Sequence, residues 1–183
     1  MTHSVIDELE GALRRHARTR PDDPVAGQFL RFLASAPQVF ERNHAPGHFT
    51  GSAWLVSADA ERVLLTHHRK LGRWLQLGGH ADGDRDLAGV ALREAEEESG
   101  LQHLVVDPAI FDLDRHLIPA RGEEPAHWHY DVRHVVRATG SEDFAVSEES
   151  LELAWRPVRA IAQDPQADAS LRRMAHRWLA RNP

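Results

Sequence analysis

The sequence contains no cysteine, and this absence excludes several kinds of chemistry. Without cysteine, the chain cannot form disulfides, bind zinc through thiolates or use a cysteine nucleophile. Aromatic residues are also scarce, at 7% of the chain, with a single tyrosine. The absence of cysteine is compatible with a reducing compartment, and we predict a cytoplasmic location.

Long apolar runs and an excess of positive charge are missing too. No apolar run approaches the roughly 20 residues that span a bilayer, so we expect no membrane segment. The N-terminus is charged and amphipathic, and it lacks the apolar centre of a signal peptide. The formal net charge is −6, whereas general nucleic-acid binders usually have a basic balance. The charge therefore argues against a nucleic acid polymer as partner.

The remaining composition is that of one globular domain. The chain has 183 residues, of which 42% are hydrophobic, and roughly 100–200 residues per domain is usual. We predict a single domain over residues 1–183, with an N-terminal helical extension (1–45), a β-rich core (47–160) and a C-terminal helix (169–180).

The apolar spacing predicts the elements of this domain. We expect helices over 4–18 and 25–36, and the clearest helix over 86–99. Strands are expected over 49–57, 62–67, 104–118, 127–138 and 151–157. Mostly antiparallel strands beside segregated helices indicate an α/β class of the α+β or layered α/β/α kind.

Four glutamates crowd the C-terminal half of the clearest helix, where the helix dipole disfavours negative charge. Glu94 and Glu98 are also like charges at i,i+4, which costs helix stability. At about 100° per residue, Glu94, Glu97 and Glu98 fall within an arc of roughly 100°, and Glu96 points away. A glutamate run is usually a solvated face, but hard cations such as Mg²⁺ prefer oxygen ligands. The double glycine and acidic turn before this helix favour a cation site.

The segment from Gly79 to Leu101 resembles the Nudix box, G-x5-E-x7-R-E-U-x-E-E-x-G-U, where U is apolar. The matching positions are Gly79, Arg93, Glu94, Ala95, Glu97, Glu98, Gly100 and Leu101. The first glutamate of the pattern falls on Arg85, with Asp84 and Asp86 on either side. We expect a neighbouring aspartate to support the loop and helix start instead.

The resemblance implies a Nudix-like α/β/α sandwich with a mixed β-sheet. It also implies a hydrolase that cleaves a diphosphate linkage in a small nucleoside diphosphate derivative, with Mg²⁺ or Mn²⁺ as cofactor. The implied metal ligands are Glu94, Glu97, Glu98 and the carbonyl of Gly79. Homodimers are common in the family, and a homodimer is one expectation here.

Two further residues receive roles in this hydrolase. Arg93 flanks Glu97 on the helix and is expected to orient it through a charge-assisted hydrogen bond. A carboxylate must take the proton of the attacking water. Glu149 is our candidate for this base outside the box, with Glu148 and Glu152 as alternatives to it.

The chain has 13 histidines, and some of them follow a strand pattern. In the segment 127–131, period two places His127 and His129 on one strand face with Asp131. With His116 from the preceding strand, these imidazoles could ligate a transition metal. The alternative, which we favour, is that they line the substrate cleft. The expected substrate-binding residues are His80, Arg115, His127, His129 and Arg133.

Two rival functions stay open. One is a non-catalytic Nudix-fold ligand-binding protein, although such proteins usually lose box glutamates that this chain keeps. The other is a metalloprotein that uses the cluster of His116, His127 and His129. Dependence on Mg²⁺ or Mn²⁺ supports the hydrolase, whereas tightly bound zinc, iron or nickel supports the histidine site.

Overall fold

The computed structural model describes residues 5–21, 24–69, 72–146 and 150–181. Its helices are α1 (Val5–Thr19), α2 (Val25–Leu33), α3 (Leu87–Ser99), α4 (Val158–Gln163) and α5 (Ala169–Arg181). Its strands are β1 (Gly47–Val56), β2 (Arg62–His68), β3 (Arg73–Leu75), β4 (Leu77–His80), β5 (Leu104–Ile118), β6 (His127–Ala138) and β7 (Ser150–Pro157). None of the described helices is long and apolar enough to cross a membrane.

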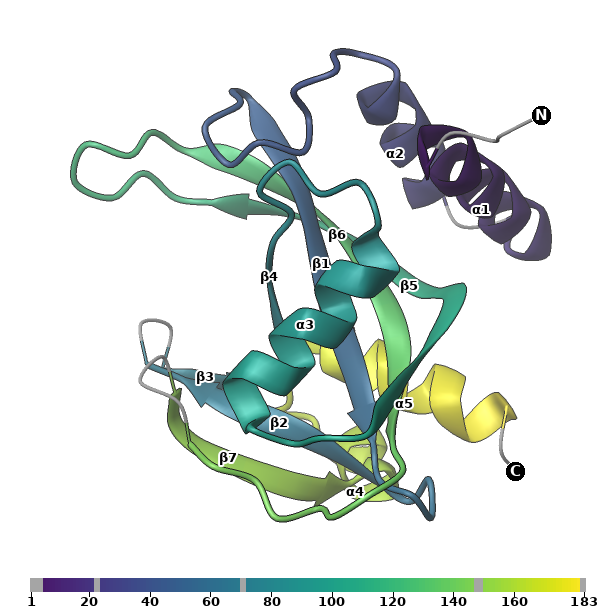
Figure 1. The fold of residues 1–183 in the computed structure, drawn as a ribbon, viewed down its shortest axis with the longest axis vertical. Helices are drawn as coiled ribbons and strands as arrows, with labels where there is room; N and C mark the ends of the chain where they lie inside the picture. Colours follow the sequence, from purple (N-terminus) through teal and green to yellow (C-terminus); the bar gives the residue numbers. More distant parts are fainter. Residues whose placement is uncertain (1–4, 22–23, 70–71, 147–149, 182–183) are drawn as a thin grey trace.

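Strand β1 lies at the centre of the mixed sheet. The main path runs β3-β2-β1-β6-β5, with β4 also paired to β1 and β7 to β2 (Figure 1). Strands β1 and β6 are parallel, and their register aligns His48 with His129 and Thr50 with Asp131. On its other side, β1 pairs antiparallel with β4, so that Gly51 lies opposite Gly79. Side chains of three strands therefore meet around the first half of β1.

Helices cover both faces of this sheet, which confirms the α/β/α sandwich. Helix α3 crosses one face, and α5 lies on the other (Figure 1). The core beneath α3 contains Ala53, Leu55, Ala91 and Ala95. The core beneath α4 and α5 contains Trp54, Val56, Phe111, Ile161, Leu171, Met174 and Trp178. Alternation along β1 thus supplies both cores from one strand.

Aromatic contacts attach the N-terminal helices to the α3 side of the sheet. The ring of Phe32 stacks on Tyr130 with centroids 3.7 Å apart, and Phe29 meets the same tyrosine at 5.3 Å. Phe40 stacks on Phe49 of β1 at 5.0 Å. The N-terminal extension is therefore packed into the domain through buried rings.

The sequence did not predict β4 as a strand. Gly78 and Gly79 have low strand propensity, and the four-residue strand is too short to show alternation. Its pairing with β1 over four consecutive positions overrides that propensity. The box glycines therefore lie on an ordered strand, which fixes their backbone opposite α3.

Helix α3 approaches β1 closely at Gly51. A Cβ atom at this position would lie 2.9 Å from the carbonyl oxygen of Leu87 and 2.9 Å from Cγ1 of Val90. Real Cβ atoms essentially never come this close to backbone atoms. Only glycine at this position allows the first turn of α3 to lie directly on the strand.

We predict that Gly51→Ala lowers the free energy of unfolding by about 1–3 kcal/mol, because the added methyl forces α3 away from β1. Urea unfolding measures this. Gly27→Ala is the matched control, since its Cβ would contact Arg31 only at 3.5 Å within α2. That change should be neutral or stabilising by up to about 1 kcal/mol. Equal stabilities of the Gly51→Ala variant and the wild type would contradict the close packing.

Candidate active site

Two aspartates hold the loop before α3. Asp86 caps the helix by accepting a hydrogen bond from the Gly89 N–H at 3.0 Å. Asp84 accepts from the Asp86 N–H at 3.0 Å and from Arg93 Nη1 at 3.2 Å. These contacts confirm that aspartates support the loop where the box pattern has a glutamate. They also correct the role expected for Arg93, which binds Asp84 of the loop rather than orienting Glu97.

Two of the box glutamates turn toward the backbone of β4. Glu98 accepts a hydrogen bond from the Gly78 N–H at 2.8 Å. A Cβ atom at Gly79 would overlap the carboxylate of Glu94. Both glutamates are partly buried, whereas Glu96 and Glu97 are exposed. The absence of side chains at residues 78–79 therefore lets carboxylate oxygens reach the main chain of the strand.

This arrangement fits a hard divalent cation. Carboxylate and carbonyl oxygens are the ligands that Mg²⁺ and Mn²⁺ prefer, and the glycine backbone leaves room for them. The carboxylates of Glu94, Glu97 and Glu98 do not form a tight group. Among the described residues, the ligating side chains that gather within 4.8 Å of one another are three histidines instead.

An arginine outside the box also reaches this loop. Arg42 forms an ion pair with Asp82, and Glu94 is among its electrostatic neighbours. No sequence pattern marks Arg42, because it lies in an irregular segment between α2 and β1. It places a positive charge beside the carboxylates.

The histidines gather on the opposite face of the sheet from α3. Nitrogens of His48, His80 and His129 lie within 4.8 Å of one another. His127 joins them, with its Nε2 3.3 Å from Nε2 of His129. His116 lies at the margin, where its Nδ1 contacts Asp114 at 3.0 Å. The sequence pattern did not predict His48 as a member of this cluster. In the structure its side chain is buried, with 1% exposed.

Burial favours the neutral form of His48, His80 and His129. Desolvation, followed by the neighbouring histidines, lowers the pKa of His48 to about 4 and that of His129 to about 2. Burial also lowers the pKa of His80, with Arg42 adding to the effect. Neutral imidazoles present both a hydrogen-bond donor and a lone pair.

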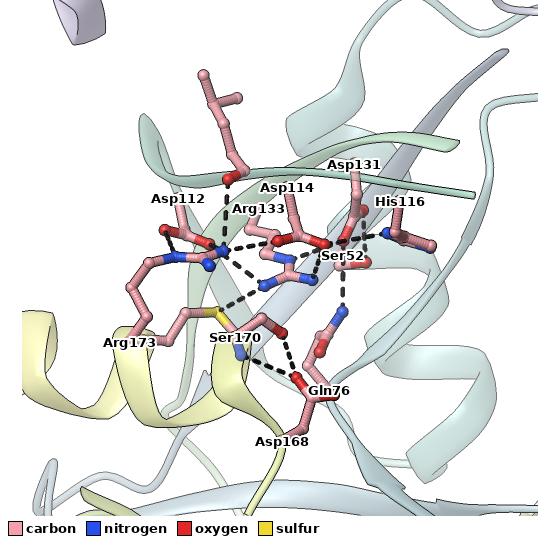
Figure 2. Close-up of polar contacts among 12 residues, drawn as sticks. Ser52, Gln76, Asp112, Asp114, His116, Asp131, Arg133, Asp168, Ser170 and Arg173 are labelled. Atoms are coloured by element: carbon pink, nitrogen blue, oxygen red, sulfur yellow. Dashed lines mark hydrogen bonds and ion pairs between the residues drawn. The ribbon is translucent and has the colours of Figure 1, made fainter. Parts of the chain in front are cut away.

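Further along β6 from His129, Arg133 forms ion pairs with three aspartates (Figure 2). Its Nε donates to Asp131 at 2.7 Å, its Nη1 to Asp112 at 3.2 Å, and its Nη2 lies 3.4 Å from Asp114. Arg173 of α5 contacts Asp112 at 2.7 Å and Asp114 at 2.8 Å. Arg133 is 2% exposed, so it stabilises this buried network of charges, which we call the floor of the histidine cluster. It does not reach the surface to bind phosphate, as the sequence suggested.

Arg115, another expected substrate-binding residue, does not join the cluster. Arg115 points to the other face, where its guanidinium lies 3.6 Å from the ring centroid of Trp128 and its Nη1 contacts Gln28 at 3.4 Å. It therefore does not accompany the histidines. Glu149 and Glu148 lie outside the described residues.

A cavity of about 550 Å³ lies between β3, β7 and the C-terminal helices. Trp74, Arg73 and Arg156 are among its lining residues. The Arg156 guanidinium lies 4.6 Å from the Trp74 ring centroid. Strand β3 leads into β4 through Gln76, whose amide donates to Asp131 at 3.3 Å. Trp74 and its arginine neighbours therefore lie beside the strand that precedes the box in the sequence.

Comparison with protein families matches the NUDIX domain to residues 48–178. The chain therefore belongs to the NUDIX family, the family of Nudix-type pyrophosphohydrolases to which the box resemblance pointed. The matched range ends within α5, a helix that the sequence pattern placed beyond the core. No curated protein matches the chain.

Solved structures share the fold. A NUDIX-family hydrolase from Clostridium perfringens is 23% identical, with a TM-score of 0.58 over 74% of this chain and 98% of that chain. The dihydroneopterin triphosphate pyrophosphohydrolase of E. coli is 16% identical, with a TM-score of 0.59 over 73% and 95%. The NUDIX domain of Shewanella oneidensis NrtR in complex with ADP ribose is 18% identical, with a TM-score of 0.52 over 86% and 98%.

We predict that Arg133→Met lowers the free energy of unfolding by about 3–5 kcal/mol, because it leaves buried Asp131 without its guanidinium partner and leaves Asp112 and Asp114 to Arg173. Chemical denaturation measures the loss. Arg14→Met is the control, since the exposed Arg14–Glu10 pair contributes at most about 1 kcal/mol. A loss no larger than that of the control would show that the buried network contributes little.

Asp114 gives a pH prediction. Burial opposes its charge, but His116, Arg133 and Arg173 outweigh this effect and hold its pKa below the usual value. The unfolded chain therefore binds the proton first, and the unfolding free energy that Asp114 contributes is lost as the pH falls below about 4. Asp114→Asn should flatten the acid side of the stability curve.

Unfolding at a series of pH values between neutral and about pH 2 tests this. Asp143→Asn, at an exposed position, is the control. An Asp114→Asn curve parallel to that of the wild type below pH 4 would contradict the assignment.

Proposed function

We propose that the protein is a divalent-metal-dependent hydrolase that cleaves a diphosphate linkage in a nucleoside diphosphate derivative. The observation that carries this proposal is the seating of Glu94 and Glu98 against the bare backbone of β4. A sequence that accumulates negative charge at a helix C-terminus loses stability unless a cation compensates it. The same carboxylates argue against a purely ligand-binding role.

Glu94, Glu97, Glu98 and the Gly79 carbonyl are the residues that would hold Mg²⁺ or Mn²⁺. When bound, such an ion neutralises diphosphate charge and lowers the pKa of water. The chain's own contribution is mainly positioning, as in other phosphoryl transfers. Asp84 and Asp86 fix the start of α3, and this holds the glutamates at the edge of β4.

Proton transfer and substrate binding fall to other residues. We propose Glu149 as the base that accepts the proton of the attacking water, with its neighbour Glu148 and with Glu152 as alternatives. His80 and His129, whose pKa values burial lowers, present neutral imidazoles that can donate hydrogen bonds to phosphate oxygens. Arg42 adds a positive charge near Glu94.

The substrate class is supported by chemistry and by the related structures. One of these is named for a pterin triphosphate, and another was solved with ADP ribose. The cavity lined by Trp74, Arg73 and Arg156 is our candidate position for the base, although His67 already stacks on the Trp74 ring with centroids 5.3 Å apart. We therefore propose a small nucleotide derivative as substrate, for an enzyme that acts in the cytoplasm and forms a homodimer.

A phosphate- and diphosphate-release screen over nucleoside diphosphate derivatives, with Mg²⁺ or Mn²⁺, tests this proposal. We predict activity on one class, and a fall in kcat of about a hundredfold or more in Glu97→Gln, where an oxygen ligand loses its charge. Glu96→Gln is the matched control, because Glu96 is exposed one residue away. Equal losses in both variants, or no activity in a folded wild type with either metal, would contradict the proposal.

A further inference from the structure

Three strands bring three imidazoles to one point on the α5 side of the sheet. His48 comes from β1, His80 from β4 and His129 from β6. Their ligating nitrogens lie within 4.8 Å of one another, and the three ring centroids are 4.8–5.2 Å apart. The register explains the convergence, because His48 pairs directly with His129. Thr50, two residues further on β1, pairs with His80.

His48 is difficult to explain by hydrogen bonding alone. Its side chain is buried, and neither ring nitrogen has a hydrogen-bond partner in the described structure. A buried polar group without a partner costs about 1–3 kcal/mol. The cost is removed if one nitrogen binds a ligand between the three rings.

The orientation of His127 points to the same ligand. Its Nδ1 lies 2.9 Å from the Pro125 carbonyl, so Nδ1 carries the proton and Nε2 keeps its lone pair. Such a bond to a backbone carbonyl is how metal-binding histidines are usually oriented. Nε2 of His127 then accepts a hydrogen bond from Nε2 of His129 at 3.3 Å, and about 3.3 Å is also the separation of two nitrogens that share a tetrahedral zinc.

We propose that His48, His80 and His129 bind one transition-metal ion of the zinc class, with His127 beside them as a fourth nitrogen donor. Neutral imidazole selects zinc, cobalt, nickel or copper over Mg²⁺, which prefers oxygen. This site is separate from the box carboxylates, because consecutive residues of β4 face opposite sides of the sheet. Gly79 faces Glu94 on the α3 side, and His80 faces the other histidines on the α5 side. The ion would tie β1, β4 and β6 together, whatever reaction the box glutamates perform.

Co²⁺ binding tests the proposal directly. The full chain, freed of any affinity tag and stripped with a chelator, is titrated with Co²⁺ in excess Mg²⁺, which occupies the box carboxylates. We expect one equivalent with the intense visible absorption of tetrahedral cobalt, which Zn²⁺ then displaces. Zn²⁺ should also raise the melting temperature, since it binds the folded chain.

Variants locate the ion. His129→Gln and His80→Gln, at partly exposed positions, should weaken Zn²⁺ binding at least about a hundredfold in competition with a chromogenic chelator. His176→Gln, at an exposed position on α5, and Glu97→Gln should bind as the wild type does. His48→Gln is compared with these only if its circular dichroism shows that it folds.

Three results would overturn the site. These are a wild type that takes up no stoichiometric Co²⁺, histidine variants that bind Zn²⁺ as tightly as the wild type, or loss of binding in Glu97→Gln alone. None of them would bear on hydrolysis, because activity with Mg²⁺ is measured separately.

Discussion

The close approach of α3 to the glycines of β1 and β4 is the constraint on which the rest of the molecule depends. At Gly51 and Gly79 a single methyl group would collide with the helix backbone or with the Glu94 carboxylate. Because these positions have no side chain, the helix lies directly on the strands. Glu94 and Glu98 then reach the backbone of β4, where carboxylate and carbonyl oxygens lie close together. The aspartates of the preceding loop and the left-handed Gly100 fix where this helix begins and ends.

Strand β4 separates two kinds of chemistry. On the α3 side, carboxylates meet backbone in the arrangement that suits hard cations. On the α5 side, neutral imidazoles gather above a floor of buried charges. Arg133 and three aspartates form this floor, and Thr50 and Ser52 add hydrogen bonds to Asp131 at 2.9 and 2.7 Å. Buried charges destabilise a fold unless they are paired and hydrogen-bonded, and these are.

Sequence patterns predicted the box and the longer helices and strands, but not the short strands β3 and β4 or the short helix α4. Helical periodicity located α3, alternation located the long strands, and the spacing of glycine, arginine and glutamates identified the family. The position of Arg115 could also have been read from alternation. It neighbours His116 on β5, and consecutive strand residues point to opposite faces, so both could not line one cleft.

Other features depend on register that no local pattern reveals. His48 meets His129 only because β1 and β6 are parallel neighbours across a long stretch of chain. Two of the aspartate partners of Arg133, Asp112 and Asp114, come from β5, whose register shifts near Ile110. From sequence alone, Arg133 could be interpreted as a phosphate-binding residue, because its buried aspartate partners are known only from the structure.

We propose above all that the box glutamates form the cation site of a hydrolase. Anomalous scattering from Mn²⁺, in crystals grown with a nucleoside diphosphate derivative that resists hydrolysis, would locate the ion. We predict a peak between the carboxylates of Glu94, Glu97 and Glu98 and the Gly79 carbonyl, in contact with the diphosphate. At saturating Mn²⁺, no peak there in a well-ordered crystal, or Mn²⁺ only among the histidines, would contradict it.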